Sequence, residues 1–166
     1  LIPRDDSKRD VSGVREAFGE FSNLLNRYPN SRYAQDARAR MVYIRNMLAR
    51  HEVHVANYYF KRGAYIAALK RGQNVVETMQ ETTAVADGLA VMAQAYILLE
   101  MNYLAEDTIR VLCVNYPAHP NLDGDCNFDG GYDIDGLERS WLNQVSFGLL
   151  DPPEAPQFDF RPGFES

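Results

Sequence analysis

The 166-residue chain has few cysteines, no long apolar run and no catalytic motif, and each absence excludes a class of protein. Its 2 cysteines are too few for a disulfide-rich scaffold and lack the neighbouring ligands of a zinc site. No stretch approaches the ~20 apolar residues that a membrane-spanning helix needs. The chain also has no Gly-x-Ser-x-Gly elbow and no phosphate-binding loop, so we expect neither an enzyme nor a cofactor.

Charge is distributed unevenly along the chain. The formal net charge is −6 at neutral pH, but arginine dominates the first 71 residues and Asp and Glu dominate the remainder. This polarity indicates that different faces meet different partners. The basic half lacks the lysine-rich run and interleaved aromatic residues of a nucleic-acid site, so nucleic acid is not expected as a partner.

Apolar residues recur at helical spacing through most of the first 117 residues. The pattern predicts helices at 14–28, 33–62, 64–79, 85–99 and 104–115. The second stretch has no Gly or Pro before Gly63, so we expect one long helix there, capped at its C-terminal end by Gly63. No segment alternates polar and apolar residues with β-branched side chains, and the predicted fold class is therefore all-α.

The helices also repeat. In tetratricopeptide repeats, small residues occupy the points where two helices cross, and a proline follows the second helix. With Ala93 as the small residue of a first helix, Ala105 and Pro117 fall where the second helix requires them. Ala56 begins a weaker match to the same template. We therefore predict a superhelix of antiparallel helix pairs in which residues 1–117 are the C-terminal units of a longer array, with generic amphipathic helices as the alternative.

Two motifs resemble metal sites but are incomplete. The segment HEVH at residues 51–54 spaces its histidines by three, whereas a zinc-protease helix needs a spacing of four, and a packed histidine is the simpler interpretation. The segment DCNFDG at residues 125–130 matches the start of a calcium loop, but Gly136 stands where the bidentate glutamate belongs. We expect no metal site, and interpret the second segment as part of an acidic, glycine-rich loop.

Composition divides the residues after 117 into three segments. They are an acidic loop (118–135), a short amphipathic helix (136–150) and an extended Pro-rich tail (151–166). The two adjacent prolines at 152–153 stop any helix that reaches them. We expect the acidic loop to stay in solvent. Some of the phenylalanines of the tail are expected to rest on a surface: Phe158, Phe160 and Phe164.

The short helix carries a narrow apolar stripe. Leu137, Trp141 and Val145 follow one another at intervals of four residues. Repeat arrays expose the apolar face of their last helix and need a cap. We therefore predict that this helix folds back on the last repeat with Trp141 buried. The alternative is that it docks on another protein, with the tryptophan exposed.

Several strings in the chain resemble the BamD/ComL family of outer-membrane protein assembly lipoproteins. The most specific are YPNSRY at residues 28–33 and ANYYFKRGA at residues 56–64. The resemblance covers residues 5–116, the C-terminal half of that family's array. It implies a periplasmic protein with five tetratricopeptide repeats, held to the outer membrane by a lipidated N-terminal cysteine. The anchor and first repeats would lie upstream of Leu1, and the tail is longer than the family's.

The resemblance also implies a function. It implies a non-catalytic scaffold subunit of the β-barrel assembly (BAM) complex, docked on a periplasmic POTRA domain of the central, BamA-like barrel subunit. Other assembly lipoproteins would be partners, and unfolded outer-membrane proteins would bind the repeats absent from this sequence. Arg71 matches the family's charged docking contact, with Arg62 and Lys70 beside it. The alternatives are a solvated arginine and a generic peptide-binding adaptor or cochaperone.

The implied compartment bears on the cysteines. Disulfides form readily in the oxidising periplasm. Cys113 and Cys126 are separated by a short connection that contains Pro and Gly. We therefore expect a disulfide between them, with two unpaired thiols as the alternative.

Overall fold

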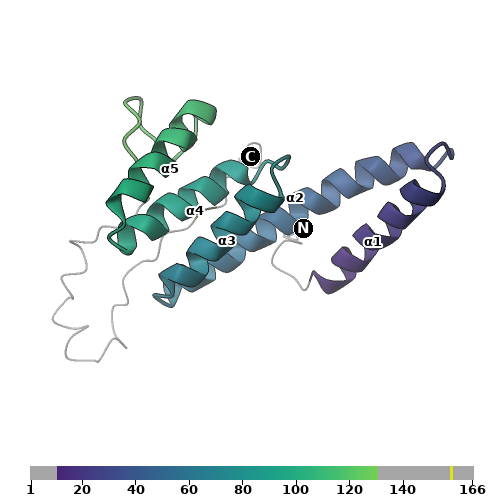
Figure 1. The fold of residues 1–166 in the computed structure, drawn as a ribbon, viewed down its shortest axis with the longest axis horizontal. Helices are drawn as coiled ribbons and strands as arrows, with labels where there is room; N and C mark the ends of the chain where they lie inside the picture. The colour runs from purple at the N-terminus through teal and green to yellow at the C-terminus, as the bar shows by residue number, and fades with distance from the viewer. Residues whose placement is uncertain (1–10, 131–157, 159–166) are drawn as a thin grey trace, which may run out of the picture.

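The computed structural model describes residues 11–130 and Phe158, and over these residues the protein is helical, with one isolated β-bridge between Leu122 and Phe128. The helices in the described part are α1 (Ser12–Arg27), α2 (Ala34–Lys61), α3 (Tyr65–Thr78), α4 (Val85–Leu98) and α5 (Asn102–Asn115). Each packs mainly on its neighbours in the chain, which is the arrangement of a repeat array (Figure 1). The all-α prediction is confirmed.

The single long helix predicted before Gly63 is α2, which runs for 28 residues. Figure 1 shows α1 beside its first half and α3 beside its second half. The helix ends at Lys61, and two residues later Gly63 has a φ of +66°. The N–H groups of Gly63 and Ala64 donate to the carbonyls of Phe60 (2.9 Å) and Tyr59 (3.0 Å), the bonding pattern of a Schellman cap.

Small residues line the main core where helices cross. The template alanines Ala56, Ala68, Ala93 and Ala105 are all buried. At the crossing of α3 and α4, a Cβ atom on Gly72 would lie 2.8 Å from the carbonyl oxygen of Gly88. The tetratricopeptide pattern carries an aromatic residue four positions after the alanine of the second helix, which here is Ala68. Gly72 stands at that position because the two backbones approach too closely for any side chain.

The helix α1 belongs to a smaller, separate core. No α1 residue is buried, but Phe18 and Phe21 pack against Ile44 and Leu48 of α2. In contrast, α4 is covered on almost every side, by α3, α5 and the segment that follows α5. The array is therefore most tightly packed around α4.

The start of the predicted acidic loop is folded. The N–H of Asp123 donates to the carbonyl of Asn127 (3.1 Å), and the Asp123 carboxylate accepts the backbone N–H groups of Asp125 and Asn127. Hydrogen bonds from the side chain and then the backbone of Asn127 hold the pKa of the Asp123 carboxyl below its usual range. The acidic side chains face solvent, whereas the apolar Leu122 and Phe128 pack on the main core.

A disulfide joins Cys113 of α5 to Cys126 of this loop, with Cα atoms 5.7 Å apart. The bond fastens the loop to the last helix of the described array. The predicted cap formed by Leu137, Trp141 and Val145 lies outside the described residues, as does most of the Pro-rich tail. Phe158 is the described part of that tail, and it is buried.

Candidate interaction surface

The predicted partner-binding residues surround the turn between α2 and α3. The Arg62 guanidinium lies 5.2 Å from the centre of the Tyr58 ring, and that of Arg71 lies 5.9 Å from the Tyr59 ring. The two tyrosine rings meet edge to face at 5.9 Å, so they connect the two arginines. Lys70 is exposed, and it points away from Arg71 because successive helical residues face different directions.

Arg71 is bound to a buried carboxylate of the same chain. Its Nη1 donates to Oε2 of Glu52 at 3.0 Å, while Nη2 of Arg15 donates to Oε1 at 3.2 Å. The Glu52 side chain is 2% exposed, against 40% for Arg71 and 53% for Arg15. One carboxylate therefore links α1, α2 and α3, and its burial is tolerated because two cations compensate its charge.

This geometry leaves Arg71 able to bind a second anion. The hydrogen bond to Glu52 raises the pKa of Arg71 above its usual value, so the guanidinium stays charged. A guanidinium carries five N–H donors, of which the bond to Glu52 uses one. The exposed part of Arg71 is thus a charged donor whose position is set by Glu52 on one side and the Tyr59 ring on the other.

Glu52 is the residue that the sequence analysis missed. The HEVH segment was interpreted through its histidines, but the buried row of α2 runs at intervals of four residues through Ile44, Leu48, Glu52, Ala56 and Phe60. A glutamate in that register is itself a signal, because a carboxylate on a buried face requires a cation from another element. The HEVH segment therefore contributes an ion-pair acceptor to the structure.

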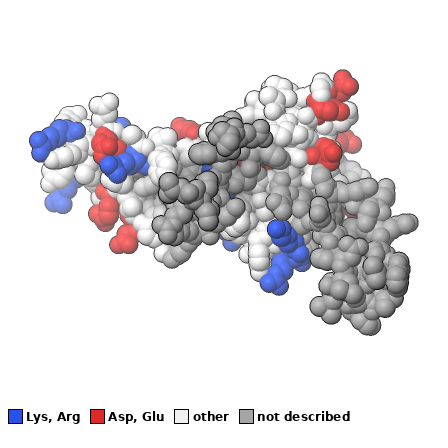
Figure 2. All heavy atoms as spheres, turned by 180° about the vertical axis from the view of Figure 1, so that it is seen from behind, with Lys and Arg blue, Asp and Glu red and all other residues white. Residues whose placement is uncertain are grey.

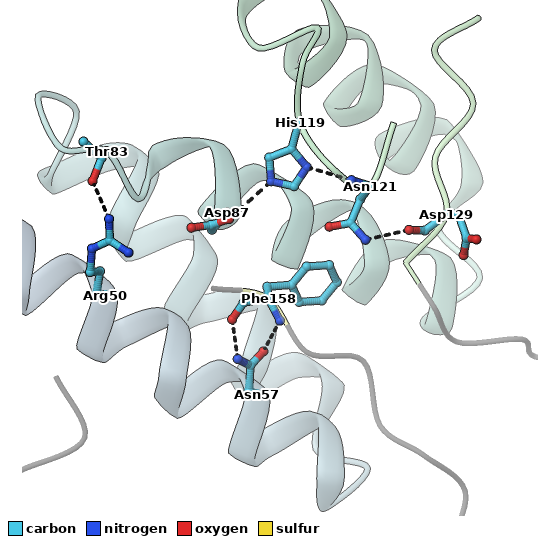
Figure 3. A network of polar contacts seen from close by, with 8 residues as sticks. All are labelled: Arg50, Asn57, Thr83, Asp87, His119, Asn121, Asp129 and Phe158. Atoms are coloured by element: carbon cyan, nitrogen blue, oxygen red, sulfur yellow. Dashed lines mark hydrogen bonds and ion pairs between the residues drawn. The ribbon is translucent and has the colours of Figure 1, made fainter. Parts of the chain in front are cut away.

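A second polar network joins the segment after α5 to α4 (Figure 3). Nε2 of the His119 imidazole lies 3.3 Å from Oδ1 of Asp87. Nδ1 of the same ring accepts a hydrogen bond from the backbone N–H of Asn121. This acceptor role at Nδ1 places the proton on Nε2, where it faces the carboxylate. Both side chains are buried, so the pair fastens this segment against the first turn of α4.

The charge polarity of the sequence is visible on the surface. Figure 2 shows Lys and Arg at the end formed by α1 and the start of α2, and again near the turn between α2 and α3. Asp and Glu lie without blue neighbours at the opposite end, where α5 lies, whereas at the α1 end they are interspersed with Lys and Arg. Arg62 follows the end of α2 and Arg71 lies in α3, so the predicted partner-binding arginines belong to the elements on either side of that turn.

The described residues contain no group of three or more His, Cys, Asp and Glu side chains placed to hold a metal ion. Of the helices in 11–130, none combines the length and apolar composition required to cross a bilayer.

Comparison with known proteins gives consistent matches over the helical region. The family model YfiO, described as an outer membrane lipoprotein, matches residues 2–112. The outer membrane protein assembly factor BamD of Neisseria meningitidis serogroup B is 47% identical over 122 residues, which are 74% of this chain and 46% of that protein. The BamD of Xylella fastidiosa is 41% identical over 120 residues, 72% of this chain and 41% of that protein.

The BamD of Haemophilus influenzae is 40% identical over 111 residues, 67% of this chain and 42% of that protein. The chain therefore spans less than half the length of each of these relatives. The family match ends within α5, so it covers the turn between α2 and α3 and excludes the segment beyond Leu112.

Proposed function

The chain belongs to the YfiO/BamD family of outer membrane lipoproteins, and from this premise we propose that it is a non-catalytic scaffold of outer-membrane protein assembly. The relatives that carry the name assembly factor are 47% and 41% identical to it over 122 and 120 residues. In this proposal the whole protein works at the periplasmic face of the outer membrane, held there by a lipid anchor. The disulfide between Cys113 and Cys126 suits that oxidising compartment.

The proposed partner is the barrel-forming subunit of the assembly machinery, a BamA-like protein, bound through a periplasmic POTRA domain. The single observation that supports this most is the half-exposed Arg71, held between Glu52 and Tyr59. An arginine whose side chain is already oriented loses less entropy when it binds a carboxylate. Arg62, stacked on Tyr58, extends the same basic and aromatic surface. Other assembly lipoproteins, and unfolded substrates bound by further repeats, complete the proposed set of partners.

The test is the affinity of this chain for the purified periplasmic domains of the barrel subunit. Arg71→Gln removes the charged donor and should weaken binding about 10- to 100-fold, the usual effect of one charged hydrogen bond. Arg110→Gln is the matched control, since Arg110 is an exposed arginine paired with Asp107 on α5. It should bind like the wild type.

Glu52→Gln separates docking from folding. It removes the negative charge but keeps a side-chain oxygen that can accept a hydrogen bond from Arg71, so Arg71 stays oriented while its charge is less neutralised, and binding should be retained or strengthened. If Glu52→Gln instead loses affinity as Arg71→Gln does, Arg71 acts by holding the helices together. Unchanged affinity of Arg71→Gln removes this residue from the docking surface.

A further inference from the structure

Phe158 returns from the far end of the chain into the main core. Its side chain is 0% exposed, and its ring centre lies 5.8 Å from that of Phe60, with the rings tilted by 54°. Phe60 itself lies on the buried face of α2. The main core of the array therefore encloses one aromatic side chain of the tail, which contacts Phe60 of α2.

The backbone of Phe158 is held by the side-chain amide of Asn57. Oδ1 of Asn57 accepts the N–H of Phe158 at 2.9 Å, and Nδ2 of Asn57 donates to the carbonyl oxygen of Phe158. One amide therefore satisfies both polar backbone groups of one residue, as a neighbouring strand does in a β-ladder. Because these hydrogen bonds involve only backbone groups of residue 158, they do not depend on its side chain and could hold the backbone of any extended peptide.

The hydrogen bonds from Asn57 and the packing of the ring on Phe60 correspond to the two kinds of contact by which proteins recognise peptides. Main-chain hydrogen bonds provide affinity for an extended segment, and a pocket for one side chain provides specificity. Asn57 and Phe60 are three residues apart on α2 and therefore share a face of that helix. Figure 3 shows the Phe158 backbone turned toward Asn57 and its ring turned toward His119 and Asn121.

We propose that Asn57 and Phe60 form a binding site for an extended peptide that carries a phenylalanine, and that Phe158 of this same chain is its resident ligand. This inference goes beyond the assembly function and does not depend on it. A ligand tethered to its own receptor competes at a high effective concentration. A separate peptide of the same chemistry therefore binds only when Phe158 is absent from the site.

The test uses a fluorescent peptide with the sequence of residues 153–163, titrated into the full chain by fluorescence polarisation. The Phe158→Ala chain lacks the ring that packs on Phe60, so its own tail competes less well, and this chain should bind the peptide at least about tenfold more tightly than the wild-type chain does. Adding Asn57→Ala to that chain should remove the gain. A peptide with Phe158→Ala should fail to bind, whereas the matched peptide with Phe160→Ala should bind normally.

Hydrogen exchange gives a second readout, with a variant that keeps the Phe158 side chain. In the wild-type chain the Phe158 amide should be protected, and Asn57→Ala should speed its exchange by at least about tenfold. Asn115→Ala is the control, because Asn115 is exposed and its side-chain amide donates to the Val111 carbonyl of its own helix. Absence of peptide binding by a helical Phe158→Ala chain would overturn the proposal, as would an unprotected Phe158 amide in the wild type.

Discussion

At the scale of single residues, Glu52 has the largest structural role. It receives Arg15 from α1 and Arg71 from α3 while almost wholly buried. The two arginines are each about half exposed, so water solvates the parts of the guanidinium groups that do not contact Glu52 directly. Removing the cations costs more folding free energy than removing the carboxylate. An unpaired Glu52 would be a buried charge without compensation, whereas unpaired arginines at these positions remain solvated by water.

This asymmetry predicts non-additive stabilities. Arg15→Ala and Arg71→Ala should each lower the free energy of unfolding by about 1–2 kcal/mol, since one cation remains on Glu52. The double variant leaves a buried carboxylate with neither arginine and should lose about 3–5 kcal/mol, more than the sum of the two. Urea denaturation measures all three, and Glu52→Gln in the double background should recover part of the loss. Strict additivity would contradict the shared-carboxylate interpretation.

Arg71 could be singled out from the chain alone, but its partners could not. Its place after the Gly63 turn and its resemblance to a family position pointed to it. Glu52 lies 19 residues before it and Arg15 lies 37 residues before Glu52. Which of several glutamates contacts an arginine depends on how three helices cross. The local periodicity of the sequence does not determine these crossings.

At the scale of elements, helix ends follow local chemistry closely. Gly63 ends α2 in the left-handed region, as expected of a C-terminal cap. Glu100 ends α4 with φ of +59° and the same pair of hydrogen bonds, from Glu100 to Ile97 and from Met101 to Tyr96. Only the first of these two caps was visible in the sequence, because a glutamate does not signal the left-handed conformation.

The crossing of α3 and α4 yields a matched pair of glycine substitutions. Gly72→Ala puts a methyl group 2.8 Å from the Gly88 carbonyl oxygen, so the helices must separate, at a cost of about 1–3 kcal/mol. Gly19→Ala in α1 meets nothing within 4 Å and should gain about 0.5–1 kcal/mol through helix propensity. Chemical denaturation measures both. A Gly72→Ala protein as stable as the wild type would show that the crossing tolerates a side chain.

At the scale of the whole molecule, the stack of helices and its order could be predicted, because repeated helix pairs pack against their chain neighbours. The return of Phe158 to α2 could not be predicted in detail. Asn57 and Phe158 are 101 residues apart, and no periodic pattern links them. Some of the tail phenylalanines were expected to rest on a surface of the array, and Phe158 does so, buried against the main core. The predictions for Leu137, Trp141 and Val145 concern residues beyond the described part of the chain.

The polarity of charge also belongs to this scale. The basic surface near the turn between α2 and α3 and the acidic end at α5 lie apart on the molecule. A scaffold with such separated surfaces can hold two partners of opposite charge at once. In the proposed complex, the barrel-forming subunit binds the basic surface.

The most direct test of the central claim is capture of the purified periplasmic domains of the barrel-forming subunit by the immobilised 166-residue chain. The account predicts that the domains are retained, and that retention falls as salt rises, because the proposed contact is charged and partly exposed. Failure to retain them at low salt, by a chain whose circular dichroism is helical, would contradict the proposed docking role.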